Sequence, residues 1–461
     1  MLNPIPKPAT TRAHDLRELL QLAWPMLIGQ VAQLGTGVAD TIMAGAEGPT
    51  DLAAVAIGFS IWLPVYIFSI GVLSSITARI ARAFGANNEP SQATVLQQGF
   101  WLALALAALL FAMIPFGHHL LPLMHVDGAV QPQTRIYLQG MTMGIPAVMG
   151  FQVLRALSEG SGRSRPVMVI QIIALLANLP LNYIFIHGLF GAPRLGGAGC
   201  GWATGCVMWL QLLLLAALTR PRWRELLAHP ILRGARGPQL KVLKELFLLG
   251  APIGGAMFAE TSIFSGAALL VGQLGATTLA AHQIALNYSA MMFMVPMSLG
   301  LALTVKIGHA LGANEPSRAR RFAGFGAITS VLFAVCSAIV MLVFPYQISS
   351  AYTADEAVRQ LTVQILAYSA SFQLFDGLQV TAVGSLRGYH DTRMTMAFTL
   401  IAYWAVGLPL GYVLGLTDLI APAHGVLGLW TGLIGGLAVA AVLLNWRLVV
   451  ISKRHLFSAV A

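Results

Sequence analysis

Charged side chains are scarce in this sequence. Asp, Glu, Lys and Arg make up 10% of the 461 residues, whereas 57% are hydrophobic and the mean hydropathy is +0.75. Soluble domains carry about 25% charged residues. A chain this long and this apolar cannot bury all of its aliphatic surface in a water-soluble fold. The composition therefore predicts a protein whose surface faces lipid.

Several kinds of functional motif are also missing. The three cysteines, Cys200, Cys206 and Cys336, form no CxxC pair and no Cys/His cluster, so the sequence indicates neither a zinc site nor a disulfide framework. There is no GxxxxGK[ST] segment, so the chain is not its own ATPase. No catalytic constellation is evident either. We therefore expect neither an enzyme nor an organic cofactor.

Long apolar stretches recur along the whole chain, separated by short polar breaks. Each has about 20 residues or more, the length that an α-helix needs to cross a bilayer. Helices are expected because backbone groups in hydrocarbon must find their hydrogen-bond partners within the segment. The twelve predicted spans are 19–42, 52–78, 96–122, 134–156, 167–189, 198–219, 243–271, 279–305, 321–345, 357–384, 394–416 and 423–447.

The basic residues alternate in step with these spans. If the N-terminus is cytoplasmic and every span crosses, all but three of the 27 Lys and Arg residues fall in cytoplasmic segments. The exceptions are Arg135, Arg194 and Arg359. Cytoplasmic loops of membrane proteins carry such an excess of Lys and Arg. The pattern predicts a multi-pass protein of a bacterial inner membrane with both termini cytoplasmic. It also explains the net charge of +10 without a nucleic-acid partner.

The two halves of the sequence resemble each other. The segment ARAFGANNEPSQA at 81–93 returns as GHALGANEPSRA at 308–319, and GSGRSR near 160 aligns with GYHDTR near 388. Six spans per half give both halves the same orientation, so an axis along the membrane normal should relate them. We expect an all-α polytopic membrane protein with two six-helix lobes around a central cavity. Its predicted segments are a cytoplasmic tail 1–18, a lobe 19–219, a cytoplasmic basic linker 220–242, a lobe 243–447 and a cytoplasmic tail 448–461.

Three acidic residues, Asp40, Glu260 and Asp376, fall within predicted spans. An ionised carboxylate at the bilayer centre costs about 2.5–3.5 kcal/mol or more, and such residues usually face a bundle interior or a wet cavity. The alternative is a structural carboxylate satisfied by neighbouring donors. The spans offer no basic residue to pair with these acids. We therefore expect them to attract cations.

Amide side chains accompany the acids at helical spacing. Asn178 and Asn182 form an i, i+4 pair, so both should point the same way, toward Asp40. Gln33 shares the helix face of Asp40. Each half thus offers a cluster of oxygen ligands. In the second half, the polar residues near Glu260 and Asp376 are Gln283, Asn287, Gln373 and Gln379.

These oxygen ligands suit a small cation. Glu260 and Asp376 could hold Na⁺, and a desolvated carboxylate can equally hold a proton near neutral pH. The sequence leaves that choice open. A cationic, partly apolar substrate is expected, because the rest of the cavity wall must be aliphatic, aromatic and rich in Met.

Several segments, in order along the chain, resemble one known family. They are AWPMLIGQVAQLGTGVADTIMAG at 23–45, FGANNEP at 84–90, LGAPIGGAMFAETSIFSGAALLVGQLG at 249–275 and LRGYHDTR at 386–393. The sequence resembles the multidrug and toxic compound extrusion (MATE) family, and within it the NorM-type bacterial exporters. The resemblance implies a V-shaped pair of lobes, alternating access, and export of organic cations and drugs in exchange for Na⁺ or H⁺.

The resemblance also implies roles for particular residues. In that family an Asp of helix 1, a Glu of helix 7 and an Asp of helix 10 carry the coupling ion, and these positions match Asp40, Glu260 and Asp376. The family often has a tyrosine one turn before the helix-10 acid, where this sequence has Phe372. The missing hydroxyl leaves the ion and the details of the second site open.

Two other classes of function compete with a cation antiporter. A flippase for lipid-linked or amphipathic molecules would need Arg and Lys in the cavity, whereas the basic residues here lie in predicted loops and tails. A receptor or scaffold would be expected to carry a soluble domain, and the sequence shows no such segment. We expect a monomer in the bilayer whose partners are small organic cations and Na⁺ or H⁺.

Overall fold

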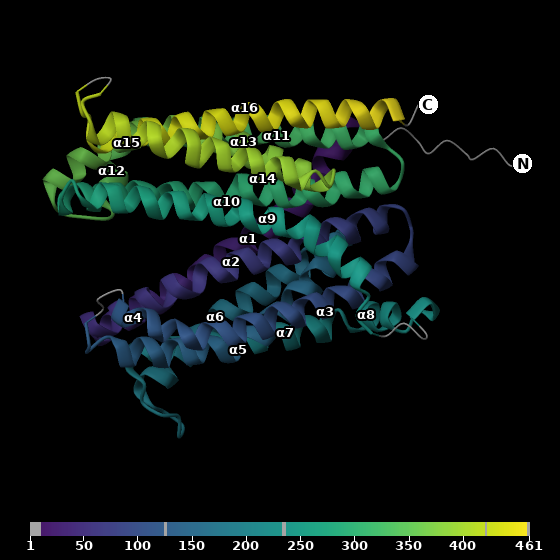
Figure 1. The fold of residues 1–461 in the computed structure, drawn as a ribbon, viewed down its shortest axis with the longest axis horizontal. Helices are drawn as coiled ribbons and strands as arrows, with labels where there is room; N and C mark the ends of the chain where they lie inside the picture. The colour runs from purple at the N-terminus through teal and green to yellow at the C-terminus, as the bar shows by residue number, and fades with distance from the viewer. Residues whose placement is uncertain (1–10, 124–126, 233–236, 420–421, 459–461) are drawn as a thin grey trace, which may run out of the picture.

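The computed structural model of the chain describes residues 11–123, 127–232, 237–419 and 422–458. Within these ranges the regular secondary structure is entirely helical. Figure 1 shows two helical bundles side by side, with both ends of the chain at the same end of the molecule. The fold is the expected one, twelve transmembrane helices in two six-helix lobes.

The first lobe is built from six long helices, coloured purple to blue in Figure 1. Prolines lie inside several of them. Membrane helices tolerate such prolines because neighbouring helices satisfy the backbone groups that a proline leaves unpaired. The helices are α1 (Arg12–Glu47), α2 (Pro49–Gly85), α3 (Glu89–Met113), α5 (Gln131–Gly160), α6 (Arg165–His187) and α7 (Gly199–Leu218), with the short pieces η1 (Ile114–His119), α4 (Leu120–Leu123) and η2 (Gly196–Ala198) between them.

The second lobe, teal to yellow in Figure 1, repeats this plan. Its fifth transmembrane segment is interrupted by the π-helical segment η4 (Ile401–Gly407), which joins α14 (Thr392–Leu400) to α15 (Leu408–Leu416). The other helices are α9 (Leu240–Gly272), α10 (Ala276–Gly312), α11 (Pro316–Val343), the short α12 (Pro345–Ser350), α13 (Glu356–Gly388) and α16 (Val426–Ser458).

The linker between the lobes packs against the first lobe. It contains α8 (Arg220–Leu227) and η3 (Pro230–Leu232), whose Leu226 and Leu232 are buried in the core of that lobe. Residues 233–236 lie outside the described ranges. Past them, the backbone N–H of Gln239 donates to Oε1 of Gln98 at 2.8 Å. The linker therefore holds α9 against the first lobe.

The internal repeat appears in the backbone as well as in the sequence. Asn87 and Asn314, which occupy the same place in the repeated GAN segment, both adopt a left-handed conformation, with φ of 51° and 59°. Asparagine tolerates this conformation just after a helix. Gly162 and His390, which align with a shift of 228, also have positive φ, 78° and 63°. The repeated motifs therefore specify equivalent turns in the two lobes.

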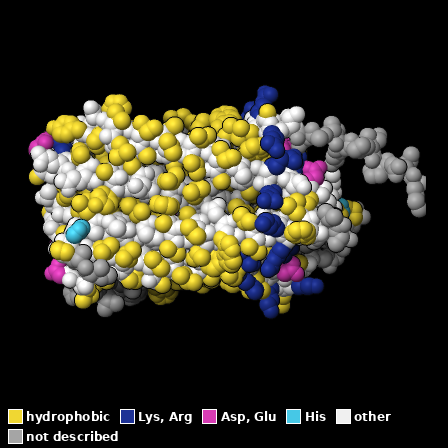
Figure 2. Space-filling view, turned by 90° about the horizontal axis from the view of Figure 1, so that it is seen from above, with side chains coloured by type: hydrophobic (Ala, Val, Ile, Leu, Met, Phe, Trp, Pro, Cys, Tyr) yellow, Lys and Arg dark blue, Asp and Glu magenta, His cyan; other side chains and the backbone are white. Residues whose placement is uncertain are grey.

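The outer surface fits a bilayer. Nine helices within the described ranges are long and apolar enough to cross a membrane. The other three predicted spans correspond to α1, α5 and α13, which carry more polar residues. Figure 2 shows hydrophobic side chains over the middle of the molecule and a belt of Lys and Arg near one end. We call this the basic end; both termini lie there (Figure 1).

The two lobes meet in the half of the molecule nearest the basic end. Gly71 of α2 faces Gly254 of α9 so closely that a Cβ on Gly71 would lie 2.3 Å from the Cα of Gly254. Nearer the end, a Cβ on Gly85 would lie 2.1 Å from the carbonyl oxygen of His309 on α10. From this contact α2 and α10 diverge toward the opposite end (Figure 1). The glycines thus allow a close seam between the lobes.

An ion cluster closes the same seam. Asp15 of α1 accepts hydrogen bonds from Nε of Arg318 at 2.9 Å and Nε of Arg321 at 3.0 Å, both on α11. Glu18, one turn later, pairs at 3.0 Å with Lys306 of α10 and with Arg318. We call these five residues the interlobe ion cluster. Its two acids lie in the segment predicted as the N-terminal tail, where α1 has already begun at Arg12.

Candidate functional site

In the first lobe, a carboxylate accepts hydrogen bonds from two side chains, one on each of two other helices. Asp40, on α1, is 6% exposed. Asn182 of α6 donates to its Oδ1 at 2.7 Å, and the hydroxyl of Thr204 on α7 donates to its Oδ2 at 2.8 Å. Asn182 also donates to Oδ1 of Asn178 at 3.0 Å. The predicted contact between Asp40 and the asparagine pair is confirmed.

This first-lobe site has spare hydrogen-bonding capacity. The carboxylate of Asp40 forms no ion pair within the described ranges, and Oδ1 of Asn182 is buried without a hydrogen-bond partner there. Gln33, predicted to belong to the site, is half-buried on the same helix. A buried carboxylate with neutral partners and a free acceptor can take up a proton or a small cation.

Sequence reasoning missed Thr204. It lies in the segment GCGWATGC, whose small residues suggest only close helix packing. Its contact with Asp40 depends on how α7 is rotated against α1. The spacing offered one signal: within the stretch 199–206, Thr204 lies one helical turn after Cys200, so the two side chains share a helix face. Cys200 itself is buried and its thiol donates to the backbone carbonyl of Asp40 at 3.6 Å.

In the second lobe, two acids come together from different helices. Glu260 lies on α9 and is half-buried; Asp376 lies on α13 and is 4% exposed. The two carboxyl groups are close enough to interact electrostatically. Within the described ranges no group of three or more His, Cys, Asp or Glu side chains could hold a metal ion. A cation here would therefore need other oxygen ligands besides the two carboxylates.

The expectation that no basic residue accompanies these acids is wrong for Glu260. Arg387, in the last turn of α13, is half-buried and interacts electrostatically with Glu260. The predicted span 357–384 ends before this residue and leaves it in a loop. Helix α13 instead continues to Gly388, so Arg387 belongs to the same helix as Asp376 and lies within electrostatic range of Glu260. Asp376 has no such basic neighbour among its interactions.

The amides predicted around this site divide into two groups. Gln373 is buried and donates to the carbonyl of Ser289 on α10 at 3.2 Å, and Gln379 is buried with an unpaired Oε1. Gln283 and Asn287 of α10, in contrast, are exposed. The helix rotation that buries His282 and Ser289 leaves these two amides exposed. They are therefore not part of the buried cluster around Asp376.

Phe372 belongs to an aromatic cluster. Its ring packs edge-on against Phe264 of α9 and Trp430 of α16, with ring centroids 6.1 and 5.6 Å away. The indole of Trp430 donates to Nδ1 of His282 at 3.1 Å. Position 372 thus supplies packing and no oxygen ligand.

Comparisons with known proteins agree with this architecture. The family model MatE matches residues 25–184 and 252–413, two segments whose starts are 227 residues apart, as the internal repeat requires. Multidrug resistance protein PmpM of Pseudomonas aeruginosa is 44% identical over 444 residues, which cover 96% of this chain and 93% of PmpM. Multidrug resistance protein NorM of Vibrio vulnificus is 41% identical, over 94% of this chain and 95% of NorM.

Solved structures show the same fold. The crystal structure of the eukaryotic MATE transporter AtDTX14 superposes with a TM-score of 0.84 at 18% identity, covering 97% of this chain and 99% of that one. Two six-helix lobes with a buried acidic site in each define a polytopic membrane transporter, not an enzyme. The chain belongs to the MatE family of multidrug transporters.

Proposed function

We propose that this protein exports hydrophobic organic cations from a bacterial cell in exchange for Na⁺ or H⁺, by alternating access. The observation that carries the proposal is the pair Glu260 and Asp376, two acids from different helices in the interior of one lobe. Two neighbouring carboxylates repel each other unless a proton or a cation lies between them. Such a pair therefore favours the uptake of one positive charge.

Alternating access is supported by the way the lobes meet. The glycine seam and the interlobe ion cluster both lie toward the basic end. The belt of Lys and Arg at this end supports its assignment to the cytoplasmic side, because cytoplasmic segments of membrane proteins are rich in these residues. With that assignment, this conformation would be closed to the cytoplasm, with the lobes diverging toward the opposite side. The inward-facing state would require the seam and the cluster to open.

A cationic substrate follows from the charge of the site. The carboxylates of Asp40 and Asp376 have no basic partner among their interactions, and the core of the second lobe is apolar and aromatic. Uptake of an ion at these acids would weaken their hold on an organic cation and release it outside. One elementary charge moving inward down 100 mV supplies about 2.3 kcal/mol. We propose a monomer as the working unit, because each lobe supplies its own site.

Transport in inverted membrane vesicles tests the proposal. Uptake of a fluorescent organic cation would be followed first under an imposed Na⁺ gradient and then under a pH gradient. We expect one gradient to drive uptake by the wild type, and Asp376→Asn to abolish it. Asp40→Asn would show whether the first-lobe site takes part. Gln347→Ala, at an exposed amide on the short helix α12, is the control. A wild type that responds to neither gradient would refute cation coupling.

A further inference from the structure

The π-helical segment η4 places one tyrosine inside the second lobe. Tyr403 is 2% exposed, whereas its neighbour Trp404 is 44% exposed. In this segment the backbone N–H of Leu408 donates to the carbonyl of Tyr403, five residues earlier. Pro409 follows at once and has no N–H to continue the regular pattern. Single π-helical turns of this kind often occur at functional sites.

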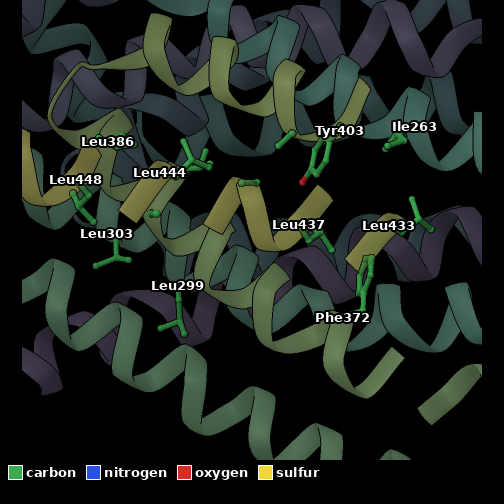
Figure 3. Close-up of a cluster of buried hydrophobic side chains, with 14 of the residues drawn as sticks. Ile263, Leu299, Leu303, Phe372, Leu386, Tyr403, Leu433, Leu437, Leu444 and Leu448 are labelled. Atoms are coloured by element: carbon green, nitrogen blue, oxygen red, sulfur yellow. The ribbon is translucent and has the colours of Figure 1, made fainter. Parts of the chain in front are cut away.

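The same segment is fastened beside Glu260. The indole N–H of Trp404 donates to the carbonyl of Ala259 on α9 at 3.3 Å, one residue before the acid. The side chain of Tyr403 interacts electrostatically with both Glu260 and Asp376. In Figure 3 its hydroxyl points into the lobe, toward the side on which Leu437 and Phe372 lie. Tyr403 therefore adds a third side chain to the paired acids.

The hydroxyl of Tyr403 is buried without a hydrogen-bond partner among the residues that the structure describes. A buried tyrosine hydroxyl normally finds a partner, because leaving one unpaired is costly. The surrounding wall is apolar, with Ile263 and Leu437 nearby (Figure 3). An unpaired buried hydroxyl within electrostatic range of two carboxylates fits a site in which a small cation lies between these groups, whereas simple core packing needs no hydroxyl there.

We propose that the Tyr403 hydroxyl is a direct ligand of the cation that binds at Glu260 and Asp376, and that it supplies the oxygen that Phe372 lacks. This inference rests on the proposed cation coupling. Two carboxylates alone make an incomplete ligand set, and a neutral phenol oxygen adds a ligand without adding charge. If the cation is Na⁺, the hydroxyl binds through a lone pair. If it is a proton, the hydroxyl donates to the carboxylate that stays ionised.

Binding to the purified full-length protein tests this assignment without transport. Na⁺ binding would be measured by titration calorimetry, and proton binding by the pH dependence of tetraphenylphosphonium binding. We expect Tyr403→Phe to weaken Na⁺ binding about tenfold or more, the loss typical of a hydrogen bond or contact to a charged group. In a proton-coupled protein it should instead move the midpoint of tetraphenylphosphonium binding to higher pH, because the carboxylate loses a donor that favours its ionised form.

Two matched variants make the test specific. Tyr389→Phe removes another buried tyrosine hydroxyl that has no partner among the described residues, at the end of α13 and beside His455. It should leave cation binding unchanged. In the Tyr403→Phe background, Phe372→Tyr returns a hydroxyl one turn before Asp376 and should restore part of the affinity. The melting temperature of Tyr403→Phe should not fall, because the deleted hydroxyl makes no structural hydrogen bond.

The outcomes separate this inference from the proposed function. The role of Tyr403 is overturned, and the proposed function stands, if two results occur together. The wild type binds a cation and Asp376→Asn abolishes this binding, whereas Tyr403→Phe binds the cation as tightly as the wild type. Equal losses in Tyr403→Phe and Tyr389→Phe would overturn it too. If the wild type shows neither Na⁺ binding nor a pH-dependent response that needs Asp376, the proposed coupling fails and the inference fails with it.

Discussion

Replacing Arg318 with glutamine should destabilise the closed seam at the basic end. Arg318 joins the lobes through both acids of the interlobe ion cluster, with contacts of 2.9 Å to Asp15 and 3.0 Å to Glu18. If the cluster holds the cytoplasmic side shut, its loss favours the open form of that side. Glutamine keeps much of the length of the side chain and removes the charge.

The size of the effect follows from burial. Exposed ion pairs contribute about 0–1 kcal/mol, whereas removing one partner of a buried pair costs about 3–5 kcal/mol. The Asp15 side chain is 0% exposed and that of Arg318 is 21% exposed. Asp15 still keeps Arg321 after the substitution. We therefore expect about 2 kcal/mol, which lowers the ratio of closed to open molecules about 30-fold.

Distance measurements between spin labels would detect this shift. Labels at Ala86, in the turn after α2, and at Ser317, in the first turn of α11, occupy exposed positions in the two lobes. The native cysteines, including the exposed Cys336, would first be replaced. Arg320→Gln is the matched control, because Arg320 is exposed and lies outside the cluster. An Arg318→Gln distribution that matches those of the wild type and the control would refute the idea that the cluster holds the seam.

The charges of the cluster also predict its response to pH. Burial raises the pKa of Asp15, but hydrogen bonds and charges from Arg318 and Arg321 outweigh it and lower the pKa below 3.8. For Glu18, burial again acts upward, and Lys306 and Arg318 bring the pKa below its usual value. A carboxylate with a lowered pKa stabilises the seam above its usual pKa and loses this effect as the pH falls through the lowered value. In an Asp376→Asn background, the distances between the spin labels across the seam should therefore not change between about pH 5 and pH 8.

Two further predictions concern packing and the first-lobe site. Gly71→Leu should block closure of the lobes, because even a Cβ there would lie 2.3 Å from the Cα of Gly254. Uptake into vesicles should fall at least tenfold. Gly37→Leu is the control, because a Cβ at Gly37 meets nothing within 4 Å, and this variant should fold and transport far better than Gly71→Leu. Thr204→Val should remove a hydrogen bond to Asp40 that contributes about 1.5–3 kcal/mol to stability. The melting temperature in detergent should therefore fall by several degrees. An unchanged melting temperature would contradict the role of that contact.

The membrane fold could be predicted because its causes are local in the sequence. Each span is recognisable by its own length and apolar composition, and the basic residues mark one end of each span. The repeated segments around Asn87 and Asn314 show that the second half repeats the helix order of the first, and both residues adopt the same left-handed conformation. The buried acids were found for a similar reason, because a charged residue inside an apolar run stands out without any knowledge of its neighbours.

The asparagine pair shows how far helical periodicity reaches. Asn178 and Asn182 are one turn apart, so they had to share a face, and one polar stripe tends to meet another. Gln283 and Asn287 also share a face, but that face is exposed and does not join the buried cluster around Asp376. Helical periodicity predicts which residues share a face of a helix, but it does not predict which neighbouring helix or surface that face meets. In α10 the buried stripe is that of His282 and Ser289.

That this chain spans a membrane as two repeated lobes, with an acid inside α1, α9 and α13, follows from patterns within single segments of the sequence. The groups that meet those acids follow from the packing of the helices and could not be predicted in this way. Thr204, Arg387 and Tyr403 reach them from other helices or from a helix end beyond the predicted span. The interlobe ion cluster joins Asp15 to Arg318, residues 303 positions apart. Such contacts depend on the rotation and crossing of packed helices, which a pattern within one helix does not encode.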